Sequence, residues 1–474
     1  MLLTSFSFLL FFPVVFLLHY CVFHKNVRWQ NVFILIASCI FYGCWDWKFL
    51  GLLMLTSLST FIAGRCMEKR TDRQRRLALI GSIVLNVGIL FVFKYCNFFV
   101  EAFVDLFALC GIELNVSTLK ILLPVGISFY TFTALSYTID VYQKKIEPTR
   151  DWLAYLCYVT FFPSILSGPI NRATKQLPQF FRVRTFNYDM VASGTKMLVW
   201  GLFVKLCVAD RLGIYVDTVY GNLMQHTGVT LFVTSIIYTL QIYADFSGYS
   251  LMAIGLGKML GIELQTNFIR PYLAKTVTDF WRRWHISLTT WFRDYIYFPL
   301  GGNRCSQGRW MLNTMIVFVV SGLWHGAAYT FLIWGAFHGL CMIVEKQVYG
   351  DRLKHMTNRM TVANGLRMCL TFMVVNFAWI FFRLDSFDNA LYTVAQIATM
   401  GGGKSIFLDQ TTLGLGLVSF FILLLKDVSD EYNWNIKLLS SSNGFVSGAT
   451  MVALICYILL FGVLNGGSFI YFQF

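Results

Sequence analysis

Long apolar stretches, separated by short polar segments, dominate the hydropathy pattern of this 474-residue chain. Residues 1–23 and 78–93 approach the roughly 20 apolar residues that a helix needs to cross about 30 Å of hydrocarbon. Similar stretches lie near 31–45, 48–64, 119–142, 192–209, 229–252, 310–325, 328–346, 367–383, 412–426 and 449–466. The pattern therefore predicts an all-α, polytopic integral membrane protein with about 11–12 transmembrane helices.

Composition supports this class. The chain is 57% hydrophobic and only 13% charged, whereas an ordinary soluble domain carries about 25% charged residues. The first stretch has no basic segment before it and no small-residue cleavage site, so we expect it to be a retained span rather than a signal peptide. Without repeats or low-complexity tracts, we predict one integral domain, with N-terminal helices at 1–118, a core at 119–383 and a C-terminal part at 384–474.

The positions of the charges predict the topology. Lys25, Arg28 and the six basic residues of 65–76 fall in loops expected to be cytoplasmic, whereas the acidic segment 98–118 is expected outside. Counting crossings from there places both termini on the outer side of the membrane. Because basic residues flank 153–168 on both sides, that stretch is expected to be re-entrant. The net charge of +14 therefore reflects loops beside a bilayer rather than a nucleic-acid partner.

One long cytoplasmic segment, 258–310, combines eight basic residues with many aromatic ones. We expect it to be amphipathic, with its rings at the lipid headgroups and its cations towards water or an anion. Arg282, Arg283 and Arg293 suit the phosphates of an anionic donor, because guanidinium groups bind phosphate in a bidentate manner. The alternative is that these arginines only signal the cytoplasmic side.

Two of the seven histidines stand out. His325 ends an apolar run in "SGLWHGAAYT", and an ionisable residue at membrane depth is a candidate functional residue. His285 lies among cations and indoles in the segment 258–310. His338 is ranked below them, as a helix-packing residue. The remaining histidines are interpreted as surface imidazoles: His19, His24, His226 and His355.

Several kinds of site receive no support. No third ligand lies at metal spacing from His285 or His325, and the twelve cysteines contain no C-x-x-C pair, so neither a metal site nor a bound cofactor is expected. The chain also lacks the phosphate-binding G-x-x-x-x-G-K-[ST] loop and the G-x-S-x-G nucleophile elbow. ATP hydrolysis and α/β-hydrolase chemistry are therefore not indicated.

The segment "WRRWHISLTTWFRDYIYFPLGGNR" (281–304), with "QIYADFSGYSLMAIGLGKMLGIELQTNFIRPY" before it and "SGLWHGAAYTFLIWGAFHG" after it, resembles the bacterial membrane-bound O-acyltransferases, most of all the alginate O-acetyltransferase membrane subunits. The segments "FFPSILSGPINR" and "NFAWIFFRLDSF" match that group too. The resemblance implies a fold around a membrane tunnel and transfer of an acetyl group from cytosolic acetyl-CoA, the donor substrate, to an extracytoplasmic polysaccharide. It also implies an SGNH-esterase-like partner, catalysis by His325 and a supporting role for His285.

The chain ends in the apolar run "FIYFQF" (469–474), which we expect to be held by packing rather than solvated. In the simpler interpretation, its aromatic residues anchor the last span at the outer interface. The resemblance implies a second one, in which Tyr471 accepts the acyl group and passes it to the partner. A phenol with a pKa near 10 needs a base to act as a nucleophile.

Other functions stay open at this stage. Alginate, another exopolysaccharide or peptidoglycan could be the acceptor, and D-alanyl transfer to a cell-wall polymer is a variant of the same chemistry. A polysaccharide transporter or flippase without acyl chemistry would also have many spans and intramembrane polar residues. Against a transporter, the chain shows no pair of related halves. A purely structural scaffold would explain neither His325 nor the arginine cluster.

Overall fold

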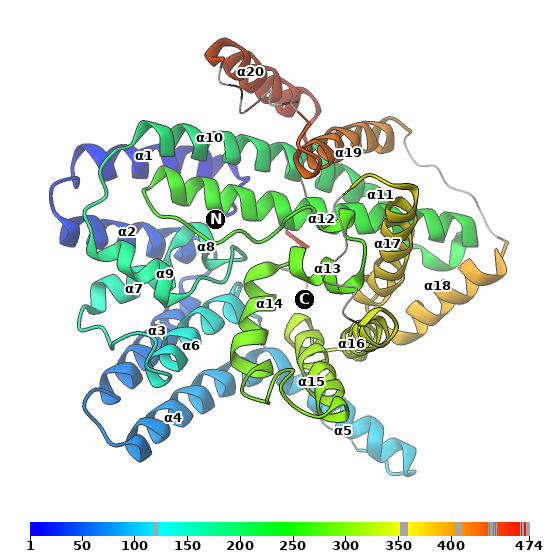
Figure 1. The fold of residues 1–474 in the computed structure, drawn as a ribbon, viewed down its shortest axis with the longest axis horizontal. Coiled ribbons are helices and arrows are strands. Elements are labelled where there is room, and N and C mark those ends of the chain that lie inside the picture. Colours follow the sequence, from blue (N-terminus) through cyan, green and yellow to red (C-terminus); the bar gives the residue numbers. More distant parts are fainter. Residues whose placement is uncertain are drawn as a thin grey trace. The chain divides into compact units, whose positions relative to one another are not determined.

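A computed structural model provides the fold (Figure 1). It describes residues 1–474 except 115, 117–121, 351–358, 403–409, 435, 437–438, 440, 442, 465, 467–468 and 471–474. The described residues form helices joined by turns and irregular segments, with no β-strand among them. They group into two compact units, Met1–Thr195 with Ala253–Gln265 and Lys196–Met252 with Thr266–Phe474. The prediction of one integral domain with internal divisions at residues 118 and 383 stays a prediction.

The first unit contains most of the N-terminal helices. Its elements are α1 (Phe6–Cys21), α2 (Val27–Gly43), α3 (Lys48–Cys66), α4 (Asp72–Leu90), the π-helical turn η1 (Phe91–Tyr95), α5 (Cys96–Leu109), α6 (Ile127–Tyr142), α7 (Trp152–Thr160), α8 (Phe162–Ile165), α9 (Ala173–Gln176) and the 3₁₀ turn η2 (Leu177–Phe181). Buried hydrogen bonds join distant parts of it. The Gln30 side chain bonds both the carbonyl and the amide of Arg184, at 2.8 and 2.9 Å.

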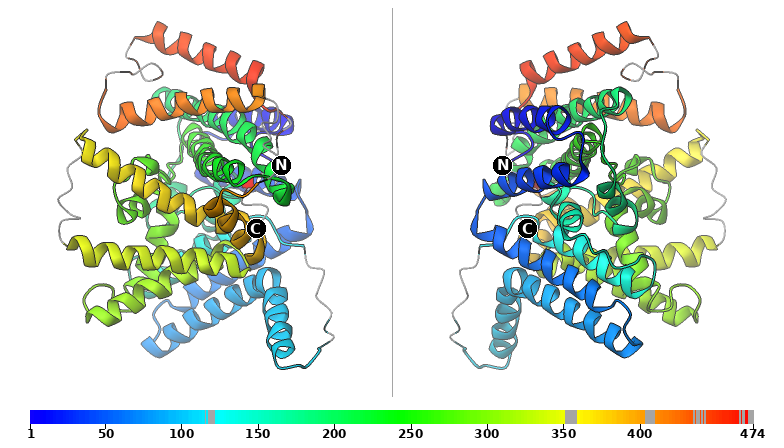
Figure 2. Two further views of the ribbon diagram at one scale, coloured as in Figure 1. Left: turned by 90° about the vertical axis from the view of Figure 1, so that its right-hand side faces the viewer. Right: turned by 90° about the vertical axis from the view of Figure 1, so that its left-hand side faces the viewer.

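The second unit carries the sequence motifs. α10 (Tyr188–Phe203) leads through the π-helical turn η3 (Val204–Ala209) into α11 (Asp210–Gly221) and the 3₁₀ turn η4 (Leu223–Gln225), and α12 (Gly228–Met259) follows. Next come η5 (Pro271–Leu273), α13 (Val277–Arg283), α14 (Ile286–Phe292), η6 (Arg293–Tyr297), α15 (Gln307–His325), α16 (Tyr329–Tyr349), α17 (Val362–Arg383), α18 (Phe387–Thr399), α19 (Gln410–Glu431) and α20 (Gly444–Phe461). Figure 2 shows α19 and α20, in orange and red, side by side, and Ser419 and Tyr457 share a hydrogen bond of 2.9 Å between them.

Local sequence signals explain where many helices begin. Thr71 and Gln74 form a reciprocal capping box at the start of α4. Asn26, Asp151 and Asn443 accept hydrogen bonds from the first free amides of α2, α7 and α20. Such caps satisfy backbone donors that a helix leaves unpaired at its N-terminus. These starts are therefore set by residues adjacent in the sequence.

The chain is a multi-pass membrane protein. Among the described residues, six helices are long and apolar enough to cross a bilayer: Lys48–Cys66, Asp72–Leu109, Gly228–Met259, Val362–Arg383, Thr411–Glu431 and Gly444–Phe461. Phe6–Cys21 and Val27–Gly43 are shorter apolar helices. Large apolar side chains such as Val84 and Leu460 are 64% and 73% exposed within the protein, which is expected where lipid is the solvent.

Two sequence expectations need revision, and a third is consistent with the structure. Much of the predicted outer segment 98–118 is helical, because α5 continues the apolar helix from α4 through η1. The rings of 258–310 are not presented to headgroups: Phe280, Trp281 and Trp284 are buried within the protein. The stretch 153–168 forms α7 and α8, of nine and four residues, which are too short to cross at 1.5 Å per residue. That break agrees with the predicted re-entrant stretch.

Candidate active site

His285 lies at the junction between α13 and α14, in a strained backbone conformation. It is 1% exposed and adopts the left-handed region, with φ 43° and ψ 52°. Non-glycine residues in this region cost about 1–3 kcal/mol and occur often at functional sites. The bend is held from outside, because the Ile286 amide donates to the Asn267 carbonyl at 2.9 Å. The strain is therefore maintained by the segment that precedes α13.

The side chain of Asn267 orients the imidazole. Asn267 Oδ1 lies 3.0 Å from His285 Nδ1 and also accepts hydrogen bonds from the amide and hydroxyl of Ser287, at 3.2 and 2.9 Å. Asn267 Nδ2 donates to Ser250 Oγ at 3.2 Å, which identifies Oδ1 as the acceptor facing the imidazole. Nδ1 of His285 therefore carries the proton, and the lone pair is on Nε2.

Burial keeps this imidazole neutral. His285 lies outside the long apolar helices, and desolvation lowers its pKa to about 3. The Phe246 ring packs edge-on against it at a centroid distance of 4.6 Å. A neutral imidazole with a fixed tautomer can accept a proton or a hydrogen bond at one defined atom.

His325 is the last residue of α15, and close helix packing places it. A Cβ added to Gly322 of α15 would collide with the Phe331 carbonyl, and one added to Gly335 of α16 would collide with the Phe318 carbonyl. The two backbones can approach this closely only because both positions are glycine. The end of α15 is thereby pressed against the start of α16.

Aromatic rings enclose His325, which is 3% exposed. The rings of Trp324, Trp334 and Phe382 have centroids 4.9, 5.0 and 5.3 Å from the imidazole. The rings of His285 and His325 lie 6.4 Å apart. The structure thus brings together the two histidines singled out in the sequence, in surroundings of low polarity.

The other histidines divide differently from the sequence expectation. His338 packs against Trp281 and Trp334, and the Trp281 indole donates to His338 Nδ1 at 3.4 Å, as expected of a helix-packing residue. The interpretation of His19 and His226 as surface imidazoles is wrong, since they are 0% and 1% exposed. The prediction relied on their positions at a span end and in a loop, and such positions do not reveal burial. His355 lies outside the described residues.

A cavity of about 730 Å³ lies between the α13–α14 segment and α15–α16. Arg282, Arg293 and Lys346 contribute its cations, and we call it the cationic cavity. Its walls are otherwise largely apolar and reach Phe318 and Ser321. Ser321 lies one helical turn before His325, so the cavity extends from the cations towards the histidines, although neither histidine lines it.

Arg283 occupies a different environment from Arg282. Its guanidinium contacts Asp279 at 3.1 Å and Glu431 at 3.0 Å, and Glu431 also holds Arg270 at 2.6 Å. The Glu431 side chain is 2% exposed. Arg283 is not among the residues that line the cationic cavity. The structure therefore places only two of the three predicted donor-binding arginines, Arg282 and Arg293, at this cavity.

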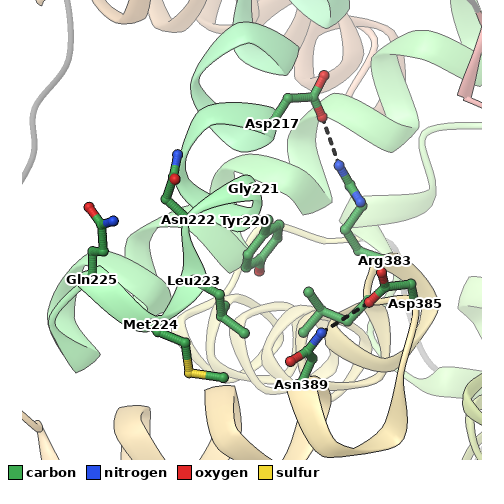
Figure 3. Close-up of a pocket in the computed structure, with 11 residues that line it drawn as sticks. Asp217, Tyr220, Gly221, Asn222, Leu223, Met224, Gln225, Arg383, Asp385 and Asn389 are labelled. Atoms are coloured by element: carbon green, nitrogen blue, oxygen red, sulfur yellow. Dashed lines mark hydrogen bonds and ion pairs between the residues drawn. The ribbon is translucent and has the colours of Figure 1, made fainter.

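A second pocket of about 480 Å³ is polar and lies where α17 ends (Figure 3). Arg383 bonds Asp217 at 2.8 Å, and Asn389 bonds Asp385 at 3.1 Å. Figure 3 shows the side chains of Asp217 and Arg383 directed at each other across this pocket. Phe382, the residue before Arg383, is one of the aromatic residues whose rings pack against His325. We call this the polar pocket.

The predicted acyl relay, Tyr471, lies outside the described residues. The two residues before it are described and buried, Phe469 at 2% and Ile470 at 4% exposed. The interpretation of Phe469 as a lipid anchor is therefore wrong, because its ring packs inside the protein against Tyr249 at 4.7 Å and Phe246 at 5.7 Å. Phe246 is also the ring that contacts His285.

Sequence reasoning missed Asn267 and Lys346 as site residues. Asn267 stands in the segment "QTNFIRPY", which contributes to the family resemblance but contains no residue with a predicted role. Lys346 followed an apolar run, where a cation indicates only a helix end. The only sequence signal for Asn267 is a polar amide side chain in a short segment that is not predicted to be helical.

Comparison with known proteins covers most of the chain. The sequence model of MBOAT, the membrane-bound O-acyltransferase family, matches residues 149–384. The chain is 35% identical over 432 residues to the probable alginate O-acetylase of Pseudomonas aeruginosa, covering 90% of this chain and 81% of that protein. It is 32% identical over 423 residues to the peptidoglycan O-acetyltransferase of Helicobacter pylori, covering 83% and 78%. It is 27% identical over 287 residues to the teichoic acid D-alanyltransferase of Bacillus subtilis, covering 56% and 70%.

Proposed function

This chain belongs to the membrane-bound O-acyltransferase family, and from that premise we propose that it carries an acetyl group from cytosolic acetyl-CoA across the bacterial inner membrane to an extracytoplasmic polysaccharide. The juxtaposition of His285 and His325, 6.4 Å apart and next to the cationic cavity, is the observation that carries the proposal. The similarity to proteins named for alginate and for peptidoglycan acetylation supports a glycan acceptor.

The first step forms an ester and releases a thiol. The Tyr471 oxygen attacks the thioester carbonyl carbon while its proton passes to His325 as general base, a role worth about 10²- to 10⁴-fold in rate. The carbon–sulfur bond then breaks, and the CoA thiolate takes the proton from His325. His285, with its Nε2 lone pair oriented by Asn267, accepts a hydrogen bond that aligns the attacking hydroxyl.

The second step reverses the chemistry on an outer acceptor. A hydroxyl of the acceptor attacks the acetyl ester, its proton returns through His325, and the tyrosine oxygen leaves as a neutral phenol. An SGNH-esterase-like partner receives the acetyl group and completes transfer to the glycan. The polar pocket, one residue from the ring that packs on His325, is the place at which this outer acceptor approaches.

The donor enters from the opposite end. With Lys25, Arg28 and 65–76 in the cytoplasm, the charge pattern places the Trp310 end of α15 there too. Arg282, Arg293 and Lys346 then meet the CoA phosphates, and the apolar walls take the pantetheine arm. Both termini lie outside in the same topology.

Polysaccharide acetylation in cells tests the chemistry. We expect His325→Ala to abolish O-acetylation of surface polysaccharide at a normal protein level. Tyr471→Phe keeps the ring and loses only the hydroxyl, so it should also abolish acetylation. Wild-type acetylation in the first strain would refute the base, and full acetylation in the second would refute the relay while leaving the acyltransferase function standing.

A further inference from the structure

The described residues after α20 run along η3 and α11 and end at the buried Phe469 and Ile470. The Phe461 carbonyl accepts a hydrogen bond from Arg211 Nε at 2.5 Å, and the Val463 amide donates to the Leu206 carbonyl at 3.0 Å. A Cβ built at Gly466 would lie 2.5 Å from Asp210 Oδ2, so the backbone passes directly against that carboxylate. The red segment that carries Phe469 and Ile470 lies beside α12 in Figure 1.

A buried ion cluster lies along this course. Lys205 Nζ contacts Asp210 Oδ1 at 2.7 Å and Asp245 Oδ1 at 2.6 Å, and all three side chains are at most 7% exposed. Lys205 belongs to the π-helical turn η3, a type of turn that is frequent at functional sites. Two buried carboxylates share one ammonium group, so some of their oxygens are left that the ammonium group does not contact. Burying charge without full compensation is unfavourable and calls for further donors.

The C-terminal segment supplies such a donor. The Ile470 amide donates to Asp245 Oδ2 at 2.9 Å. Asp245 thus uses one oxygen for Lys205 and the other for the backbone of residue 470. The next residue of α12, Phe246, contacts both Phe469 and His285. The hydrogen bond from the Ile470 amide to Asp245 and the ring contacts of Phe246 place Phe469 and Ile470 next to His285.

We propose that Lys205 and Asp245 are positioning residues that dock the C-terminal segment at Phe469–Ile470 and so set how Tyr471 approaches the histidines. That this docking positions Tyr471 for acyl transfer rests on the proposed function. Lys205 acts through Asp245, because its ammonium group claims Oδ1 and leaves Oδ2 for the Ile470 amide. Asp210 is the second carboxylate that contacts Lys205, and the backbone at Gly466 passes against it.

The test variant is Asp245→Asn. It preserves side-chain volume, but Lys205 requires the remaining oxygen, so the amide NH₂ would face the Ile470 N–H and two donors would oppose each other. Asp210→Asn is the matched control, because it removes one buried carboxylate of the same cluster and leaves both bonds of Asp245 in place. Both variants are made in the full-length protein.

The direct readout is exposure of the C-terminus to carboxypeptidase A, followed by mass spectrometry of the purified protein in detergent. We expect terminal residues to be released at least about tenfold faster from Asp245→Asn than from wild type, and at the wild-type rate from Asp210→Asn. We also expect Asp245→Asn to lose acetyl transfer while it binds acetyl-CoA with unchanged affinity. Equal release from Asp245→Asn and wild type would overturn the docking, whereas full transfer with a released segment would overturn the positioning role.

A second pair of variants keeps the test decisive if Asp245→Asn does not fold. Gly466→Ala would push the segment off Asp210, whereas Gly448→Ala lies in α20 with nothing within 4 Å of the added methyl group. Faster release of terminal residues from Gly466→Ala than from Gly448→Ala supports the docking. Equal release from the two variants refutes it. The protease readout requires no catalysis. An inactive wild type with a protected C-terminus would therefore refute the proposed function and leave the docking intact.

Discussion

At the scale of single residues, the site depends on a strained histidine and the amide that holds it. His285 occupies a backbone conformation that favours glycine, and Asn267 bonds both its backbone neighbour and its ring. An orienting acceptor on one ring nitrogen determines which nitrogen is left to accept a hydrogen bond, as the third member of a catalytic triad fixes the histidine tautomer. Asn267 is therefore a positioning residue for His285.

Replacing Asn267 tests this role. We expect Asn267→Ala to lower kcat for CoA release by about tenfold or more, because the His285 ring loses the acceptor that orients it, while the KM for acetyl-CoA changes little. Asn267→Asp keeps an acceptor oxygen for Nδ1–H and should recover part of the rate. Unchanged kcat in Asn267→Ala would remove the residue from the mechanism, and so would a lower kcat that Asn267→Asp does not recover.

The arginines provide a second prediction at this scale. Arg282 and Arg293 line the cationic cavity and are exposed, so screening limits the contribution of each. We expect either change to Ala to weaken acetyl-CoA binding by about threefold to tenfold, more strongly at low salt. Calorimetric titration of the purified protein measures this.

Arg283 serves as the control for those two arginines. Its partners are Asp279 and Glu431, so Arg283→Ala leaves a buried carboxylate with one cation fewer. We expect a lower thermal unfolding midpoint with little change in acetyl-CoA affinity. The reverse pattern, with affinity lost only in Arg283→Ala, would move the donor site away from the cationic cavity.

At the scale of elements, the contact between α15 and α16 sets the position of His325. Glycines at 322 and 335 let backbone meet backbone, and Gly339 lies against Met315 at the same interface. Helices that approach this closely depend on small residues at the contact, in membranes above all. The same pair of helices forms one wall of the cationic cavity.

Enlarging one glycine tests the importance of that contact. Gly335→Ala would force α15 and α16 apart, so we expect a destabilisation of about 1–3 kcal/mol and a lower thermal unfolding midpoint. Acetyl transfer should fall with it, because His325 ends α15. Gly308→Ala, in α15 with open space around the added methyl group, is the matched control and should be neutral or slightly stabilising. Equal midpoints for the two variants would contradict this account of the packing.

At the scale of the whole molecule, the proposed function requires that donor and acceptor meet the histidines from opposite faces of the membrane. Within the second unit, the cationic cavity reaches Ser321 and the polar pocket reaches the residue after Phe382. Both Ser321 and Phe382 belong to helices that carry or contact His325. In the proposed function, the acetyl group therefore passes from the cationic cavity to the polar pocket by way of His325.

Reporter fusions test the topology on which this depends. Alkaline phosphatase fused after Trp47 should be active, because the charge pattern places the 45–48 hairpin outside, and after Arg70 it should be inactive. A green fluorescent protein at the same two points should give the opposite result. If both reporters show the reverse pattern, the donor and acceptor faces assigned here are exchanged.

The sequence by itself determined the class of protein and the approximate position of several spans. It also singled out His285 and His325, which the structure brings together. Hydropathy and charge act through neighbouring residues and the bilayer, and a costly intramembrane imidazole is visible wherever it falls. The rings of 280–284 were misplaced because an amphipathic segment beside a membrane and one buried in protein have the same composition.

Only the tertiary structure decided the partners of these residues. Asn267 and His285 are 18 positions apart, and Asp245 and Ile470 are 225 apart, so no local pattern links them. Arg282 and Arg283 are adjacent and alike in sequence, yet one lines a cavity and the other fills a buried ion pair. Burial and distance assign these roles, because both depend on which segments pack together and not on the identity of the side chain.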